Sequence, residues 1–193
     1  MTSLRDFIIS RVRVKLLTVF LASPGKLSYI RELTRATGEE INAVRRELIH
    51  MTKAGMVSSQ KRGNRLYYWF NTQYRFYPEL VRLVAKITGL GESIIKNREK
   101  IGRVKFAAFS ARFAKALPTK KDHVDLLIVG EVVMPQIAAL VRAEEDRIKR
   151  EINYSVMTEE EFTFRKNRRD TFILDVLKQS RIMLIGDEDI LIN

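Results

Sequence analysis

Residues 110–130, SARFAKALPTKKDHVDLLIVG, place an acid and a histidine directly before an apolar run. Asp125 begins that run, and His123 lies two residues before it. Two carboxylates at this spacing on one strand would hold Mg²⁺, which prefers near-octahedral oxygen ligation. Of the two positions with this spacing, one holds His123, a poor ligand for a hard cation, and only the other, Asp125, holds a carboxylate, so the pair does not form such a site. We therefore predict no bound metal and no catalytic residue in this stretch.

The same stretch is rich in positive charge. Its cationic side chains are Arg112, Lys115, Lys120 and Lys121, with His123 next to them. An anionic ligand such as a nucleotide, or the DNA backbone, would suit this loop without a metal ion, and a solvated basic loop accounts for the same residues. The sequence also carries no HExxH, Walker or GxGxxG motif and no recognisable Ser-His-Asp set. We therefore predict no enzymatic activity and no cofactor.

Residues 103–193 alternate between strand-like and helix-like patterns. Apolar runs predict strands at 104–110, 124–130, 151–157 and 181–186. Helical spacing of apolar residues predicts helices at 134–150, at 158–166 and at about 170–177. This order indicates a small α/β domain with a mixed sheet.

Positive charge is concentrated in the first half of the chain. Residues 1–90 contain 16 Lys and Arg against 6 Asp and Glu, whereas residues 91–193 contain 19 against 17. The first half therefore has a net charge of +10 and the second +2, out of +12 for the whole chain. Such asymmetry favours a polyanionic partner for the first half, although a basic surface that serves only solubility gives the same count.

Three helices and a hairpin are predicted in this basic half. Residues 4–21, 27–38 and 39–55 carry apolar side chains at helical spacing, and Gly38 and Gly55 follow the second and third helices. The third helix has one apolar face, formed by Ile41, Val44, Leu48 and Met51. Two β-prone runs, 56–59 and 66–70, then flank a Gly63-Asn64 turn, which predicts a hairpin with a basic tip.

This order of elements resembles the small winged-helix repressors of the ArsR type. The resemblance covers roughly residues 5–75 and rests on IRELTRATGEEINAVRRELIHMTKAGMV followed by GNRLYYWFN. It implies a winged helix-turn-helix whose third helix lies in the major groove of duplex DNA, with the hairpin against the flanking backbone. Near the start of that helix, Asn42, Arg45 and Arg46 have side chains that recognise base edges. The hairpin residues expected to hold phosphates are Lys61, Arg62, Asn64 and Arg65.

Three acids lie in the same region as these candidate DNA contacts. Glu39, Glu40 and Glu47 would repel phosphates if they faced the DNA. Carboxylates at a helix start instead stabilise the helix dipole, and a carboxylate elsewhere can orient an arginine. A solvated polar face remains the alternative for the whole region.

The second half is similar to the minimal nucleotidyltransferases of the DNA polymerase β-like superfamily. The similarity rests on DLLIVGE, REINYSVMTEEEF and MLIGDED, and with a preceding winged helix it spans nearly the whole chain. In that family a Gly-Ser pair at a helix start contacts the triphosphate, and Asp-x-Asp on the next strand holds Mg²⁺. Alignment without gaps puts Ala111 and Arg112 at the Gly-Ser pair and His123-Val124-Asp125 at the paired acids. Asn153 falls at the third acid, so the resemblance implies a degenerate site and a pseudoenzyme.

Together these patterns predict a two-domain chain of the α+β or α/β class. We expect a winged helix-turn-helix at 1–76, a helical linker at 77–102 and a nucleotidyltransferase-like domain at 103–193. In the linker, an apolar stripe is predicted as a dimer contact, a domain brace or both, and consists of Leu80, Leu83, Val84 and Ile87.

The function predicted is that of a DNA-binding transcriptional regulator whose second domain supports dimerisation or senses a ligand. The expected partners are double-stranded DNA and a second copy of the chain, and an anionic or nucleotide ligand is left open. The alternatives are a nucleotidyltransferase that uses the winged helix for targeting, and a protein-interaction module. The chain has no cysteine and no apolar run of the roughly 20 residues that a membrane span needs, which is compatible with a cytoplasmic protein.

Overall fold

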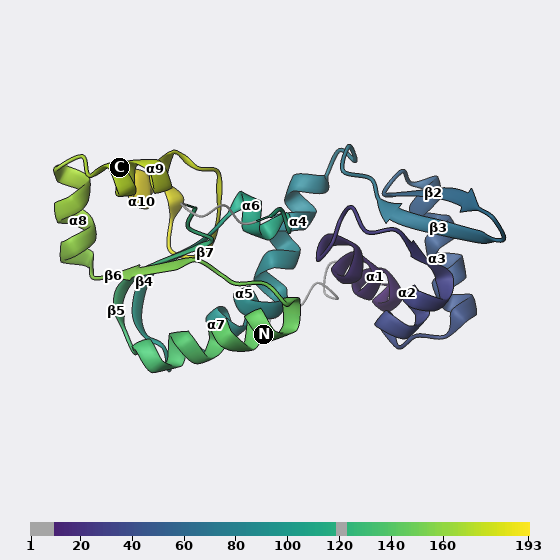
Figure 1. Cartoon of the computed structure of the whole chain (residues 1–193), viewed down its shortest axis with the longest axis horizontal. Helices are drawn as coiled ribbons and strands as arrows, with labels where there is room; N and C mark the ends of the chain where they lie inside the picture. Colours follow the sequence, from purple (N-terminus) through teal and green to yellow (C-terminus); the bar gives the residue numbers. More distant parts are fainter. Residues whose placement is uncertain (1–9, 119–122) are drawn as a thin grey trace. The chain divides into compact units, whose positions relative to one another are not determined.

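The computed structural model describes residues 10–118 and 123–193 and has a mixed α+β fold with two separate sheets. The chain divides into two compact units between Ile87 and Thr88 (Figure 1). The segment predicted as a linker, 77–102, is shared between them. Its first helix packs on the first unit and its second helix packs on the second, so each unit is described by itself.

The first unit consists of helices followed by a hairpin. Its elements are α1 (Arg11–Leu21), β1 (Ser28–Tyr29), α2 (Ile30–Thr37), α3 (Ile41–Lys53), β2 (Val57–Arg62), β3 (Arg65–Phe70) and α4 (Tyr77–Ile87). The predicted second and third helices and the hairpin are confirmed, and residues 4–9 of the first predicted helix lie outside the described residues. The core is formed by apolar side chains of α1, α2, α3 and β3, among them Leu16, Leu33, Leu48 and Phe70.

The hairpin strands are longer than the sequence predicted. β2 and β3 pair from Val57↔Phe70 to Arg62↔Arg65, so the loop is only the two residues Gly63 and Asn64. Gly63 has a φ of +56°, which a glycine adopts without the steric cost that a side chain would bring. Residues assigned to the tip, such as Lys61 and Arg62, therefore lie on paired strands. The short β1, which was not predicted, pairs with β3 on the other side.

The second unit contains a four-stranded mixed sheet. Its elements are α5 (Gly89–Lys96), β4 (Gly102–Ser110), α6 (Ala111–Ala114), β5 (Leu126–Val132), α7 (Met134–Ile148), β6 (Tyr154–Met157), α8 (Glu159–Asn167), α9 (Thr171–Lys178), β7 (Arg181–Ile185) and α10 (Glu188–Ile192). The strand order is β6-β5-β4-β7, and β5–β6 is the parallel pair. The predicted strands and helices are confirmed with shifts of two or three residues at some ends, whereas the short α6 and α10 were not predicted.

Helices cover both faces of this sheet (Figure 1). One face forms a core cluster with α8, α9 and α10, in which Phe106, Leu127 and Val129 of the sheet meet Phe162 and Ile173. Because side chains alternate along a strand, the intervening residues Phe109 and Ile128, also fully buried, point to the other face. Figure 1 shows α7, which packs against α5, on that opposite side.

Candidate functional site

Helix α3 separates an apolar face from a cationic one. Val44, Leu48 and Met51 are fully buried in the first unit, as their spacing of three and four residues predicted. Asn42, Arg45 and Arg46 are exposed on the rest of the helix. Nη1 of Arg45 donates to Oδ1 of Asn42 at 3.0 Å, so the guanidinium and the amide lie side by side on the exposed face.

The three acids near α3 interact with neighbouring groups of the chain. Glu40 caps α3, since its Oε2 accepts hydrogen bonds from the backbone N–H of Asn42 (2.8 Å) and of Ala43 (3.0 Å). The hydrogen bond from the Asn42 N–H is the main reason that the pKa of Glu40 lies below its usual value. The predicted role of an acid at the helix start is therefore confirmed for Glu40.

Glu39 and Glu47 form ion pairs with α1. Oε1 of Glu39 lies 2.5 Å from Nζ of Lys15 and 2.9 Å from Nε of Arg11, and the Lys15 contact is the main cause of a lowered Glu39 pKa. Oε1 of Glu47 lies 2.6 Å from Nε of Arg13. Glu39 and Glu47 are therefore paired with cations of α1, whereas Glu40 stays a carboxylate at the start of α3, close enough for the charges of Arg46 and Arg45 to contribute to its lowered pKa.

The hairpin extends this cationic surface. The four residues predicted to hold phosphates are all exposed: the cations Lys61, Arg62 and Arg65, and the neutral Asn64. Arg62 donates to Oε1 of Gln60 at 3.2 Å from Nη2, and the guanidinium of Arg65 lies 4.8 Å from the ring centre of Tyr29. Neither contact neutralises a charge. Both hairpin arginines therefore remain available to an anion.

A second candidate site lies at one end of the sheet of the second unit. Four residues at this end form what we call the polar row: Arg181 of β7, Ser110 of β4, and Asp125 and Asn153, which directly precede β5 and β6. Ser110 of β4 pairs with Arg181 of β7, and the Ser110 N–H donates to the carbonyl of Asp125 at 2.9 Å. The Asp125 N–H donates in turn to the carbonyl of Asn153 at 2.7 Å. By strand alternation all four share the face of Leu127 and Val129.

Asp125 is the buried acid of this row. Asp125 is only 1% exposed, and its Oδ2 accepts a hydrogen bond from the backbone N–H of Asn153 at 3.2 Å. Sequence reasoning thus named two neighbours in the row, Asp125 and Asn153, and missed the other two. Ser110 was missed although a serine directly before a helix is a usual N-cap: its Oγ accepts the Phe113 N–H at 3.1 Å. No sequence signal pointed to Arg181.

The other predicted residues of this site lie beside the row. Ala111 and Arg112 are on α6, half-buried, with Nη2 of Arg112 donating to the Pro118 carbonyl at 3.0 Å. Lys115 ends that helix, and His123 is buried close to Asp125 in the chain. Two residues of the predicted basic loop, Lys120 and Lys121, lie outside the described residues.

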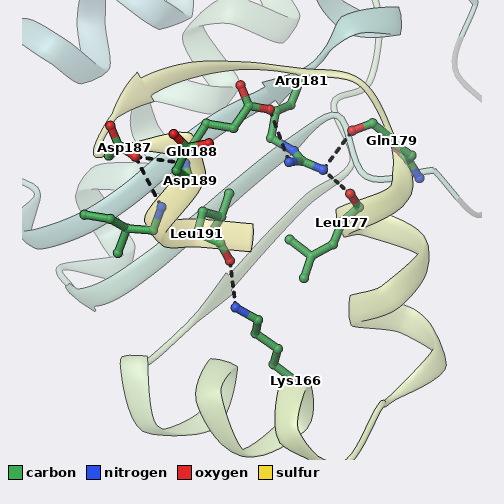
Figure 2. Close-up of polar contacts among 9 residues, drawn as sticks. Lys166, Leu177, Gln179, Arg181, Asp187, Glu188, Asp189 and Leu191 are labelled. Carbon is green, nitrogen blue, oxygen red and sulfur yellow. Dashed lines mark hydrogen bonds and ion pairs between the residues drawn. The ribbon is translucent and has the colours of Figure 1, made fainter. Parts of the chain in front are cut away.

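Arg181 bonds to three groups of its own chain (Figure 2). Nη1 lies 3.2 Å from Oε1 of Glu188, while Nη2 donates to the carbonyls of Gln179, at 2.9 Å, and of Leu177. This arginine, 8% exposed, thereby joins the end of α9, the start of β7 and the start of α10. Its charge is used to hold the unit together.

A small, mostly apolar pocket adjoins the row. Its lining consists of Ala108, Phe109, Ser110, Val124, Leu127, Val176, Gln179, Ser180 and Arg181. Within residues 10–118 and 123–193, no three His, Asp or Glu side chains gather in a way that would hold a metal ion. Besides the guanidinium of Arg181, the row offers the carboxylate of Asp125, the hydroxyl of Ser110 and the amide of Asn153.

Comparison with known proteins gives no match: no family model, no curated protein and no solved structure is similar to this chain. In the part of the chain that the structure describes, none of the helices combines the length and apolar character needed to cross a bilayer.

Proposed function

We propose that the first unit is a winged helix-turn-helix that binds duplex DNA, and that the chain is a cytoplasmic transcriptional regulator. The observation that carries the proposal is the charge arrangement around α3. Asn42, Arg45 and Arg46 are exposed, while the acids beside them are bound to α1 or to the start of α3. Two of the three acids, Glu39 and Glu47, are paired with cations of α1, and the third, Glu40, is engaged by the backbone at the start of α3, so the arginines are charged groups left exposed on this face.

In this proposal the two parts of the surface have different roles. Asn42, Arg45 and Arg46 contact base edges from α3, because asparagine pairs with adenine and arginine with guanine through two hydrogen bonds. The hairpin residues contact phosphates, which fix the position of the protein without reading sequence. Mutations in α3 should therefore change sequence preference, and mutations in the hairpin should weaken binding to all sequences alike.

For the second unit we propose a degenerate nucleotidyltransferase-like domain without catalysis. The support is chemical: the polar row holds one carboxylate, Asp125, and its neighbour Asn153 is neutral. Mg²⁺ sites built on paired acids need at least two carboxylates, whereas the row offers one. Arg181, the cation of the row, is bound to Glu188 and to two carbonyls.

The runner-up is a nucleotidyltransferase, and the buried Asp125 beside Ser110 is the observation that favours it. The two proposals separate in one assay. Mg²⁺-dependent consumption of a nucleoside triphosphate by the wild type that is lost in Asp125→Ala would support the enzyme. No such consumption by a wild type that is folded as well as the variant supports the regulator.

DNA binding is tested by titrating labelled random and genomic duplexes with the whole chain at two salt concentrations. The test variant is Arg45→Ala/Arg46→Ala, and the matched control is Arg168→Ala/Arg169→Ala, which removes the same charge from exposed positions of the second unit. We expect selective binding that weakens steeply with salt, is lost in the test variant and is kept in the control. Equal binding by both variants, or no binding at low salt, contradicts the proposal.

A further inference from the structure

Helix α3 has an isoleucine in the middle of its exposed face. Ile49 is 61% exposed, more than any other large apolar side chain described in the first unit. It shares one helix face with Asn42, Arg46 and Lys53, because these positions follow one another at intervals of four, three and four residues. The buried side chains of α3 lie on the opposite side of the helix. The core of the first unit is therefore formed without Ile49.

The fold gives Ile49 no evident role. A β-branched side chain loses rotamer freedom in a helix, and at an exposed position its methyl groups stay in water. The nearest residues on the same face, Arg46 one turn before it and Lys53 one turn after it, are exposed cations. The face thus has an apolar centre between positive charges. A partner that fits it carries negative charges on either side of an apolar group.

Duplex DNA has this combination in its major groove. The groove lies between two phosphate backbones, and thymine presents a 5-methyl group there beside its carbonyl acceptor. An apolar side chain on a helix in the groove can pack on that methyl group. We propose that Ile49 recognises thymine in this way, next to the bases that Asn42 and Arg46 contact. The inference rests on the proposed function, since it requires α3 to lie in the major groove.

Two other partners would fit the charge of this face less well or differently. RNA carries uracil, which lacks the 5-methyl group, and the deep, narrow major groove of an A-form helix does not admit side chains. An acidic protein with an apolar pocket would fit the face, but its binding would not depend on the methyl group of thymine. The response to that single methyl group therefore separates duplex DNA from both.

The first experiment locates the thymine. The whole chain selects duplexes from a random pool, as the wild type, as Ile49→Ala and as Ile190→Ala. Ile190 is the matched control, since it is 64% exposed and lies on α10 of the second unit. Ile49→Ala should select the same site but lose the preference for thymine at one position of each α3 contact, whereas Ile190→Ala should select the wild-type site. Both variants should keep the circular dichroism of the wild type, because alanine favours a helix more than isoleucine does.

The second experiment removes the methyl group from the DNA. Deoxyuridine replaces the thymine of that position in a labelled duplex and changes nothing else. The wild-type Kd should rise about three- to five-fold, which is the effect of one apolar methyl group taken out of water. Ile49→Ala should bind both duplexes equally. Because side chain and methyl group are removed separately and together, the comparison isolates the contact between them.

The third experiment adds the methyl group to another base. Cytosine at the same position should weaken binding, and 5-methylcytosine should recover about three- to five-fold for the wild type and for Ile190→Ala. Ile49→Ala should bind the two cytosine duplexes alike. Equal binding of cytosine and 5-methylcytosine by the wild type would show that the methyl group is not what the protein recognises.

The results distinguish the inference from the proposed function. A wild type that binds no duplex overturns both. Selective duplex binding that is lost in Arg45→Ala/Arg46→Ala supports the proposed function. If such binding is equally tight with thymine and deoxyuridine at every position, or if Ile49→Ala discriminates between them as well as the wild type does, the inference alone is overturned. Equal binding of the two bases is also the result expected if Ile49 serves a contact with a protein.

Discussion

Arg62 and Arg65 lie directly opposite each other on the last pair of the β2–β3 hairpin. Like charges at directly opposed positions destabilise a sheet, and no acid of the described residues forms an ion pair with either arginine. Within the fold, Arg65 lies over the ring of Tyr29 and Arg62 donates to Gln60, but neither contact compensates the two opposed charges. A polyanion that binds both would remove the repulsion, which connects the hairpin with the proposed contact to phosphates.

From this pair we predict opposite effects on stability and on binding. Arg62→Ala removes the repulsion, so the Tm should stay unchanged or rise slightly, while duplex DNA binding weakens for all sequences alike. The slope of log K against log salt should fall by about 1, as expected for the loss of one phosphate contact. Thermal melts and salt titrations measure the two effects. Gln60→Ala is the control, since it removes the hydrogen-bond acceptor of Arg62 and leaves the charge in place.

The carboxylate of Glu39 makes the stability of the first unit sensitive to acid. Its ion pairs with Lys15 and Arg11 lower its pKa in the folded state, so the folded protein binds the proton less readily than the unfolded chain. The stabilisation is therefore present above the unfolded-state pKa and is lost as the pH falls through the lower folded-state value.

We therefore expect Glu39→Gln to melt at a lower temperature than the wild type near neutral pH. The difference should shrink as the pH falls below about 4, where the unfolded carboxyl takes up its proton. Melting curves of both proteins across this range are the measurement. A difference that stays constant with pH would mean that the ion pairs contribute nothing.

Local sequence patterns predicted the surface of α3 and the hairpin but not the polar row. Val44, Leu48 and Met51 are close in sequence, so their spacing alone shows which face is buried. Ser110 and Arg181 are neighbours only because β7 pairs with β4, and the pairing register of distant strands depends on the packed sheet. The two short helices α6 and α10 were missed for a related reason, since helices of four or five residues owe their stability to tertiary contacts.

At the start of α5, Gly89 is a position where a side chain does not fit. Its φ is +52°, and an added Cβ would lie 2.7 Å from Oε1 of Glu144 and 2.8 Å from Nη2 of Arg147. These two atoms belong to an ion pair in which Glu144 is buried. Gly89→Ala should therefore strain the backbone and displace the pair, destabilising the second unit by about 1–3 kcal/mol.

Denaturant unfolding followed by circular dichroism measures this loss. Gly25→Ala is the matched control, because a Cβ at Gly25 meets no atom within 4 Å and its φ is not in the left-handed region. The control should unfold like the wild type. If Gly89→Ala also does so, neither the left-handed φ at this position nor the close approach of the Glu144–Arg147 pair carries a cost.

Arg181 gives the strongest prediction for the second unit, because its replacement removes three polar contacts at once (Figure 2). In Arg181→Met the aliphatic volume is kept, but the carbonyls of Leu177 and Gln179 and the carboxylate of Glu188 lose their donor. Hydrogen bonds from a charged group contribute about 1.5–3 kcal/mol each, but three bonds that share one guanidinium are not additive, so a loss of about 2–4 kcal/mol in unfolding free energy is expected.

Arg181→Lys should recover only part of that loss, since an ammonium group lacks the planar fork that reaches both carbonyls and Glu188. Lys178→Ala, an exposed cation on the preceding helix, serves as the control and should leave stability unchanged. Hydrogen exchange should show where the loss occurs: amides of α10 and of the end of α9 should exchange faster in Arg181→Met, while those of α3 in the first unit keep their rates. Uniformly faster exchange in both units would contradict the assignment of Arg181 as the residue that joins β7 to α9 and α10.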